Sequence, residues 1–326
     1  MYNTATECYI QILPKCDGHA YSSFYIYLPA GANYYTQYCF YYLYKPADST
    51  LSFSDSLNSQ ANSSFYRIQS AYIGTLSKQS FSPLFRALQE GELGFAFREI
   101  GAGDFSGGIH GDEILQSVSL IADSSPLALD RPTFLRFQNL TFSQTSNIYR
   151  CNTPNSKLVL HKQLYSISSR GIKLSQHIEW VADARTLQAA YSPMLTAQRL
   201  DPNRPSTILT DTVEFYTHPD GNLVAVIDTS DYGSSRPSGK PDHIYTDVPA
   251  TAVKVYGKAS GLTAETGFHI VDHSIAKEQI SSHLWVRFGN SLDNKIYFNI
   301  SANKTPKAGT VWKSNIYYRL TYTAKQ

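Results

Sequence analysis

The segment IKLSQHIEWV, residues 172–181, is the clearest indication of the fold in this chain. Its large apolar side chains fall at positions 172, 174, 178 and 180, whereas Lys173, His177 and Glu179 fall on alternate positions. Successive side chains of a strand point to opposite faces, so this pattern predicts a half-buried β-strand with one apolar and one charged face.

The same alternation recurs along the chain. Residues 283–288 and 295–301 each place apolar residues on one face, which we expect to lie against the same core as the apolar face of 172–181. Other segments rich in aromatic and β-branched residues have the same appearance. Further strands are therefore expected at 24–28, 38–44, 133–142, 158–167, 211–217, 223–228, 252–257 and 314–323.

These strands predict an all-β, antiparallel β-sandwich, jelly-roll-like, with one or two short helices. One helix is expected from Ser82 to Gly91, because Ser82-Pro83 is typical of a helix start and Gly91 of a stop. Residues 219–222 predict a hairpin turn. Loops are expected at 46–64 and 229–243. We expect one large domain over 1–326, with a division near 200–210 as the alternative.

The composition favours a protein that contacts sugars. The chain has 24 Tyr against 3 Trp and is rich in hydroxyl side chains, which suit the hydroxyls and C–H faces of saccharides. The net charge of +2 argues against a nucleic-acid binder. No run of 18 apolar residues is present, so no membrane span is expected.

The candidate site lies in a glycine-rich stretch, FREIGAGDFSGGIHGDE, residues 97–113. Only 17% of the chain is charged, yet this stretch holds Arg98, Glu99, His110 and Glu113. Glycines give the backbone freedom and let a ligand approach closely. A dense polar cluster between apolar strands is where we expect function to lie.

Other polar residues lie opposite the apolar faces of the predicted strands. Arg98 shares its face with Gly94 and Ala96, which leave room above them. If the strands belong to one sheet, their polar faces form a single surface. The substrate-binding residues expected on it are Lys173, Trp285, Arg287, Lys295 and Asn299, beside His177 and Tyr297.

The order of these residues resembles that of jelly-roll polysaccharide lyases of the alginate-lyase type. Those enzymes carry an Arg-containing strand, a Gln-x-His strand and a Tyr-containing strand on a concave sheet, and Arg98-Glu99, Gln176-His177 and the segment 295–298 follow that order. This chain departs from the pattern, since Gln and His are adjacent and no Tyr-x-Lys-x-Gly-x-Tyr run is present. The hydroxyl-rich and tyrosine-rich composition also resembles that of receptor-binding and depolymerase domains of phage tails.

The lyase resemblance implies β-elimination on an acidic, uronic-acid-containing polysaccharide. Arg98 would bind the carboxylate, His110 or His177 would remove the neighbouring proton, and Tyr297 would protonate the leaving oxygen. Glu99, Asp112 or Glu113 would orient the Arg or the His. No metal is required, although the carboxylates would also suit Ca²⁺. Such a protein would be extracellular, either secreted or virion-associated.

A hydrolase that uses two carboxylates as acid and base is one alternative from the sequence, with material for it in Glu99, Asp104, Asp112 and Glu113. Two further alternatives remain. The first is a non-catalytic carbohydrate-binding or receptor-binding module, in which Trp285 and the tyrosines carry binding. The second is a zinc-dependent peptidase or amidase, since His110 and Glu113 resemble the HxxE motif of zinc carboxypeptidases. That family requires an α/β fold, whereas the surrounding sequence predicts strands. The sequence leaves the oligomeric state open.

Overall fold

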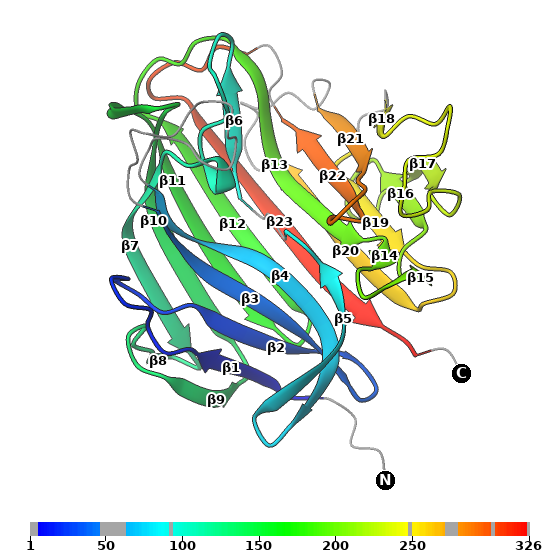
Figure 1. Cartoon of the computed structure of the whole chain (residues 1–326). Coiled ribbons are helices and arrows are strands. Elements are labelled where there is room, and N and C mark those ends of the chain that lie inside the picture. The colour runs from blue at the N-terminus through cyan, green and yellow to red at the C-terminus, as the bar shows by residue number, and fades with distance from the viewer. Residues whose placement is uncertain are drawn as a thin grey trace.

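The computed structural model describes residues 6–45, 63–90, 94–246, 250–270, 280–300 and 304–324. In these ranges the regular structure is almost entirely β, and the one helical turn among them is η1 (Gly108–His110). Nearly all strand pairings are antiparallel. The predicted all-β, antiparallel sandwich is therefore confirmed (Figure 1).

The first layer, here called sheet A, is the rear layer in Figure 1. Its strands in spatial order are β17 (Leu223–Asp228), β16 (Thr212–Tyr216), β19 (Ala252–Tyr256), β20 (Leu262–Ile270), β23 (Val311–Tyr322), β12 (Gly171–Trp180), β11 (Thr153–Ser168), β10 (Leu140–Arg150), β7 (Glu113–Ala122) and β8 (Ser125–Pro126).

The second layer, sheet B, lies in front of sheet A in Figure 1. A single parallel pairing between β4 and β7 joins it to sheet A. β6 (Ala96–Glu99) pairs with β13, and β14 (Leu200–Asp201) forms a separate small sheet with β15 (Arg204–Ile208). The strands of sheet B in order are β9 (Thr133–Phe137), β1 (Cys8–Ile12), β2 (Phe24–Gly31), β3 (Tyr34–Lys45), β4 (Ser63–Ser77), β5 (Ser80–Leu88), β13 (Leu187–Gln198), β22 (Asp293–Asn299), β21 (Ser281–Val286) and β18 (His243–Thr246).

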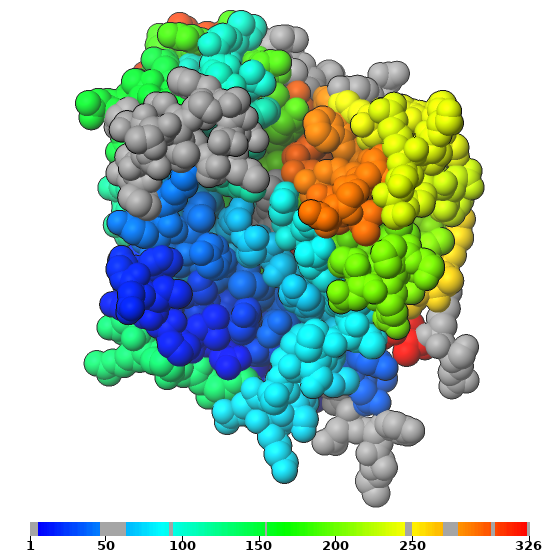
Figure 2. All heavy atoms as spheres, viewed as in Figure 1, coloured from blue at the N-terminus to red at the C-terminus, as the bar shows by residue number. Residues whose placement is uncertain are grey.

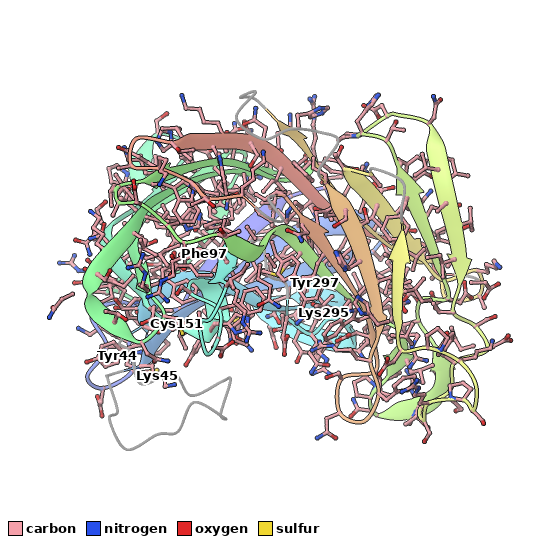
Figure 3. The ribbon with its side chains drawn as sticks, turned by 90° about the horizontal axis from the view of Figure 1, so that it is seen from above. Tyr44, Lys45, Phe97, Cys151, Lys295 and Tyr297 are labelled. Carbon is pink, nitrogen blue, oxygen red and sulfur yellow. The ribbon has the colours of Figure 1, made fainter. Side chains whose placement is uncertain are left out.

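The hydrophobic core lies between the two sheets. Aromatic rings meet across it, for example Phe268 of β20 and Phe298 of β22, whose centroids are 5.6 Å apart. Since side chains alternate along each strand, the residues next to Phe298 point away from the core, towards the surface of sheet B that faces away from sheet A. Seen from above, the molecule bends into an arch, and Lys295 and Tyr297 of β22 lie on its inner side (Figure 3). We call this surface of sheet B the inner face, because it lines the inner side of the arch although it faces away from the core.

Three expectations from the sequence are wrong. The strand expected at 133–142 is two strands, because the chain turns at 138–139 from β9 of sheet B to β10 of sheet A. The segment from Ser82 is not a helix but part of β5, because its backbone pairs with β4 and touches β13, and these non-local pairings override the local helix-start signal. The charged face of 172–181 does not join those of 283–288 and 295–301, because β12 lies in sheet A whereas β21 and β22 lie in sheet B.

Several other expectations are confirmed. The turn at 219–222 joins β16 to β17, and residues 229–242 connect β17 to β18 without a strand. Most of the loop expected at 46–64, and Gly91 as a helix stop, lie outside the described residues. In the part of the chain that the structure describes, no helix is long and apolar enough to cross a membrane.

The contribution of the core can be tested with two tryptophans of opposite exposure. Trp180 is 0% exposed and packs against Phe97 and Trp312, whereas Trp285 is 42% exposed on the inner face. We expect Trp180→Ala to lower the free energy of unfolding by about 3–5 kcal/mol, and Trp285→Ala by less than about 1 kcal/mol. Urea denaturation measures both values, and equal losses would contradict the assignment of the two faces.

Candidate functional site on the inner face

The glycines of the 97–113 stretch fold it into a tight turn. Gly107, Gly108 and Gly111 have φ values of 86°, 58° and 97°, in the left-handed region that glycine adopts without strain. A side chain at Gly107 would also collide with the carbonyl oxygen of Phe95, 2.6 Å from the position of its Cβ. The turn presents His110 at its end.

The turn is anchored in the core by the carboxylate of Glu113. This carboxylate accepts hydrogen bonds from the backbone N–H of Gly108 (2.9 Å), the hydroxyl of Ser146 (2.5 Å) and Nδ1 of His161 (3.0 Å). Burial favours the neutral acid, but these donors, with His161 the strongest, outweigh it and lower the pKa of Glu113. Because Glu113 is 1% exposed, it holds the turn rather than contacting a ligand.

The buried network continues from His161 towards the inner face. Nε2 of His161 lies 3.0 Å from the side-chain nitrogen of Gln176, which assigns the Nδ1–H tautomer facing Glu113. The oxygen of Gln176 accepts a hydrogen bond of 2.8 Å from Ser192. Ser192 follows Tyr191 on β13, so one chain of hydrogen bonds links the turn to the strand beside it.

His110 lies beside a carboxylate on the inner face. Its Nδ1 is 3.3 Å from Oδ1 of Asp104, and its ring centroid is 4.9 Å from that of Phe105. Nδ1 is buried and, despite the 3.3 Å contact, makes no hydrogen bond of good geometry in the described chain, whereas the side chain as a whole is 29% exposed. Burial raises the pKa of Asp104, but His110, the N–H of Phe105 and Arg98 together lower it by more, so the net shift of this pKa is downward.

Arg98 also lies near Phe105. Its guanidinium carbon is 6.0 Å from the centroid of that ring. Nε and Nη2 donate long hydrogen bonds, of 3.3–3.5 Å, to the carbonyls of Ala102 and Gly103. Arg98 therefore closes its own loop, and Nη1 makes no hydrogen bond to the described chain.

A continuous run of aromatic rings extends from this loop across sheet B, and we call it the ring row. Phe105 stacks on Tyr191 with centroids 5.4 Å apart, and Tyr191 stacks on Tyr297 at 4.7 Å. Tyr297 meets Trp285 edge-on at 6.1 Å. Figure 2 shows this face, with β21 and β22 in orange beside the green atoms of β13. Rings of this kind match the C–H faces of sugars.

Charged side chains flank the ring row. Nζ of Lys295 is 4.9 Å from the ring centroid of Tyr297 and 3.3 Å from a carboxylate oxygen of Glu90. Arg287 forms a bidentate pair with the buried Asp293, with bonds of 2.7 and 2.5 Å, and lies 3.5 Å from Glu90. Burial raises the pKa of Glu90, but Lys295 and Arg287 lower it more, so Glu90 stays ionised between two cations.

Two histidines close the far end of the ring row. The rings of His243 and His283 stack with centroids 5.6 Å apart, and His243 meets Trp285 at 4.8 Å. Burial and the neighbouring His243 lower the pKa of His283 to about 4, and burial also lowers the pKa of His243. Both rings are therefore neutral at pH 7.

The structure brings together seven of the residues singled out in the sequence: Arg98, His110, Trp285, Arg287, Lys295, Tyr297 and Asn299. Asn299 is 6% exposed, and its side-chain oxygen accepts a hydrogen bond of 3.2 Å from the N–H of Ala190, so it aligns β13 with β22.

The other four candidate residues from the sequence lie outside this surface. Glu99 is buried and forms a bidentate pair with Arg150, with bonds of 2.8 and 3.2 Å. Glu113 is buried as described above, on the core side of the turn, away from the exposed part of His110. Lys173 and His177 lie on the outer face of sheet A. Among the described residues, no group of three or more His, Cys, Asp or Glu side chains is arranged to hold a metal.

The sequence analysis missed several residues of this surface. Phe105, Tyr191, His283 and Glu90 lie on it, but none shares a motif with the others, since they come from a loop, β13, β21 and the end of β5. One signal was present: Pro193 interrupts an otherwise regular strand, and proline inside a strand marks an irregular register. The pairing of β13 with β22 does shift between Tyr191 and Met194.

The comparisons with known proteins give little further information. No protein-family model matches this chain, and no curated protein matches it. One solved structure, described as the crystal structure analysis of HI1317, aligns over 95% of this chain and 99% of its own length, with 8% identity and a TM-score of 0.38. At that score the likeness carries no argument about function.

A second carboxylate next to the site gives a test based on pH. Asp112 is 1% exposed and has a φ of 59°. One oxygen accepts the N–H of Asn152 at 2.9 Å, and the other has no partner in the described chain. Burial, followed by repulsion from Asp104, raises the pKa of Asp112 from 3.8 to about 7.

We expect Asp112→Asn to stabilise the protein at pH 8. A carboxyl whose folded pKa is raised binds its proton more tightly in the folded state, so the wild type loses stability as the pH rises from about 4 to about 7. The neutral amide keeps the bond from Asn152, suits the positive φ, and removes this loss, for a gain on the order of 1–3 kcal/mol at pH 8. Urea denaturation at pH 5 and pH 8 measures the free energy of unfolding of both proteins. If this free energy changes equally with pH in the wild type and in Asp112→Asn, the raised pKa of Asp112 is contradicted.

Proposed function

We propose that the inner face binds an acidic saccharide and that the protein cleaves a uronic-acid-containing polysaccharide by β-elimination. The observation that carries this proposal is the His110–Asp104 pair at the end of the ring row, with Arg98 beside it. Aromatic rings hold sugar rings, a cation attracts a carboxylate, and a histidine oriented by a carboxylate removes a proton. A secreted or virion-associated protein would meet such a substrate outside the cell.

The chemistry requires a base close to the proton beside the uronate carboxylate. The mechanism places the hydrogen of His110 on Nδ1, which faces Asp104 at 3.3 Å, so that the lone pair lies on Nε2. Nε2 then takes the C5 proton, and the electron pair that remains forms the double bond as the C4–oxygen bond breaks. Asp104 stabilises the imidazolium that results.

Arg98 and Tyr297 supply the other two roles. Nη1 of Arg98 is the donor through which the uronate carboxylate would be held and its developing negative charge stabilised. Tyr297, stacked on Tyr191, would donate its hydroxyl proton to the departing oxygen. Trp285 and Tyr191 would hold the neighbouring sugar rings, and Lys295 adds positive charge beside them.

A non-catalytic saccharide-binding module is the second candidate. The observation in its favour is that the cations of the inner face are already engaged within the protein: Lys295 and Arg287 with Glu90, and Arg98 with the carbonyls of its own loop. On this alternative the charges shape the surface, and the ring row alone carries binding.

Replacement of His110 separates the two candidates. We expect His110→Ala to lower turnover by about 10²–10⁴-fold with little change in KM, because it removes the base. Trp285→Ala should mainly raise KM, because it removes a sugar-stacking ring. His19→Ala is a matched control, since His19 packs against Tyr42 and Tyr44, outside the site. The readout is the ultraviolet absorbance of the unsaturated uronate product, over a panel of uronic-acid polysaccharides.

Two results distinguish the lyase from the binding module. Full activity in His110→Ala would exclude it as the base and contradict the lyase proposal in this form. Binding of the polysaccharide by the wild type with no unsaturated product from any member of the panel would favour the binding module.

A further inference from the structure

The outer face of sheet A carries a row of basic side chains on three neighbouring strands: a histidine between two lysines. In the register of the sheet, Lys162 of β11 lies opposite His177 of β12, and His177 lies opposite Lys313 of β23. Both lysines are exposed, and neither forms an ion pair within the described chain. Like charges on directly neighbouring strands are destabilising, so the fold alone does not account for this arrangement.

The carboxylate that faces His177 does not neutralise the row. Glu179 follows on the same strand, with Oε2 3.7 Å from Nε2 of His177. Burial, followed by the charges of Lys162 and Lys313, nevertheless lowers the pKa of His177. Lys162 from β11, Lys313 from β23 and Glu179 are thus the charged groups facing this ring, and their net charge is positive.

The row lies in a groove that adjoins a second groove. A groove of about 360 Å³ is lined by the three basic residues together with Ser175 and Asn315. Ser175 and Asn315 also line a second groove of about 980 Å³. The hydroxyl of Ser175 donates a hydrogen bond of 2.9 Å to the side-chain oxygen of Asn315. The two grooves therefore adjoin at Ser175 and Asn315 on the outer face of sheet A.

The second groove offers a ring and charges of both signs, since Lys173 and Lys254 line it together with Glu265 and Asp220. Tyr317 is half-buried in it, and its ring lies over Gly267, where a Cβ would come within 2.8 Å of the ring. Lys173 lies opposite Tyr317 in the sheet and is exposed. The positive charge lies in the first groove, on Lys162 and Lys313, whereas the second groove has balanced charges and a ring. Two lysines followed by an aromatic ring match a sugar chain that bears negative charges.

We propose that this groove is a second binding site for an acidic polysaccharide, with anionic groups on Lys162, His177 and Lys313 and a sugar ring on Tyr317. The proposal shares only its ligand class with the proposed function. Phe268 and Phe298 pack between the two sheets, so the groove and the inner face lie on opposite sides of the sandwich. A polymer held in the groove would stay attached while another of its segments occupies the inner face.

Affinity electrophoresis in gels containing polygalacturonate tests the groove directly, with neutral dextran gels for comparison. We expect the double variant Lys162→Gln/Lys313→Gln to lose at least about tenfold in affinity, since each lost cation weakens a contact with the polyanion. Lys15→Gln/Lys258→Gln is the matched control with the same change in charge, and we expect it to bind as the wild type does. Tyr317→Ala should weaken binding, and Tyr317→Phe should keep it.

The pH dependence gives an independent readout on the folded protein. A bound polyanion favours the imidazolium form of His177, so polygalacturonate should raise the pKa of His177 measured by NMR, and binding should tighten as the pH falls through that pKa. Unchanged binding by Lys162→Gln/Lys313→Gln, or equal losses in the control variant, would overturn the proposal. A protein that forms no unsaturated product but still loses polygalacturonate binding in the double variant would refute the lyase activity and leave the groove standing.

Discussion

The buried carboxylate of Glu113 is the constraint on which the inner face depends. A charge this far from water is stable only if donors surround it, and Gly108, Ser146 and His161 supply them. Ser146 and His161 belong to sheet A, whereas Gly108 belongs to the turn that carries His110. One ion thus fixes a flexible, glycine-rich loop to the rigid sheet behind it, and the network extends through Gln176 to Ser192 of β13 in sheet B.

This anchoring explains why the loop and the strands form one surface. The loop places Phe105 against Tyr191, and the pairing of β13 with β22 places Tyr191 against Tyr297. The cations and carboxylates around these rings are paired within the protein, so the surface keeps its shape without a ligand. His110, with one nitrogen turned to Asp104, is the group of this surface best placed for proton transfer.

Much of the fold could be predicted from the sequence, because alternation along a strand is a local property. Residues 171–180 and 223–228 form strands as expected, and the core faces of β12, β21 and β22 are largely those that the pattern assigned. The sheet that each strand joins is not local. His177 and Tyr297 have similar patterns around them, yet register and pairing place them on opposite sides of the sandwich. The helix predicted from Ser82-Pro83 is absent for the same reason, since the backbone of this segment pairs with β4 and β13 as strand β5.

The central claim is that a saccharide lies along the ring row, and the fluorescence of Trp285 tests it most directly. The other two tryptophans, Trp180 and Trp312, are 0% and 2% exposed, whereas Trp285 is 42% exposed. Titration with oligogalacturonates should therefore change the tryptophan emission in a saturable way, and Trp285→Phe should abolish the change. A full signal in Trp285→Phe, or no change in the wild type with any uronic-acid oligosaccharide, would contradict the account.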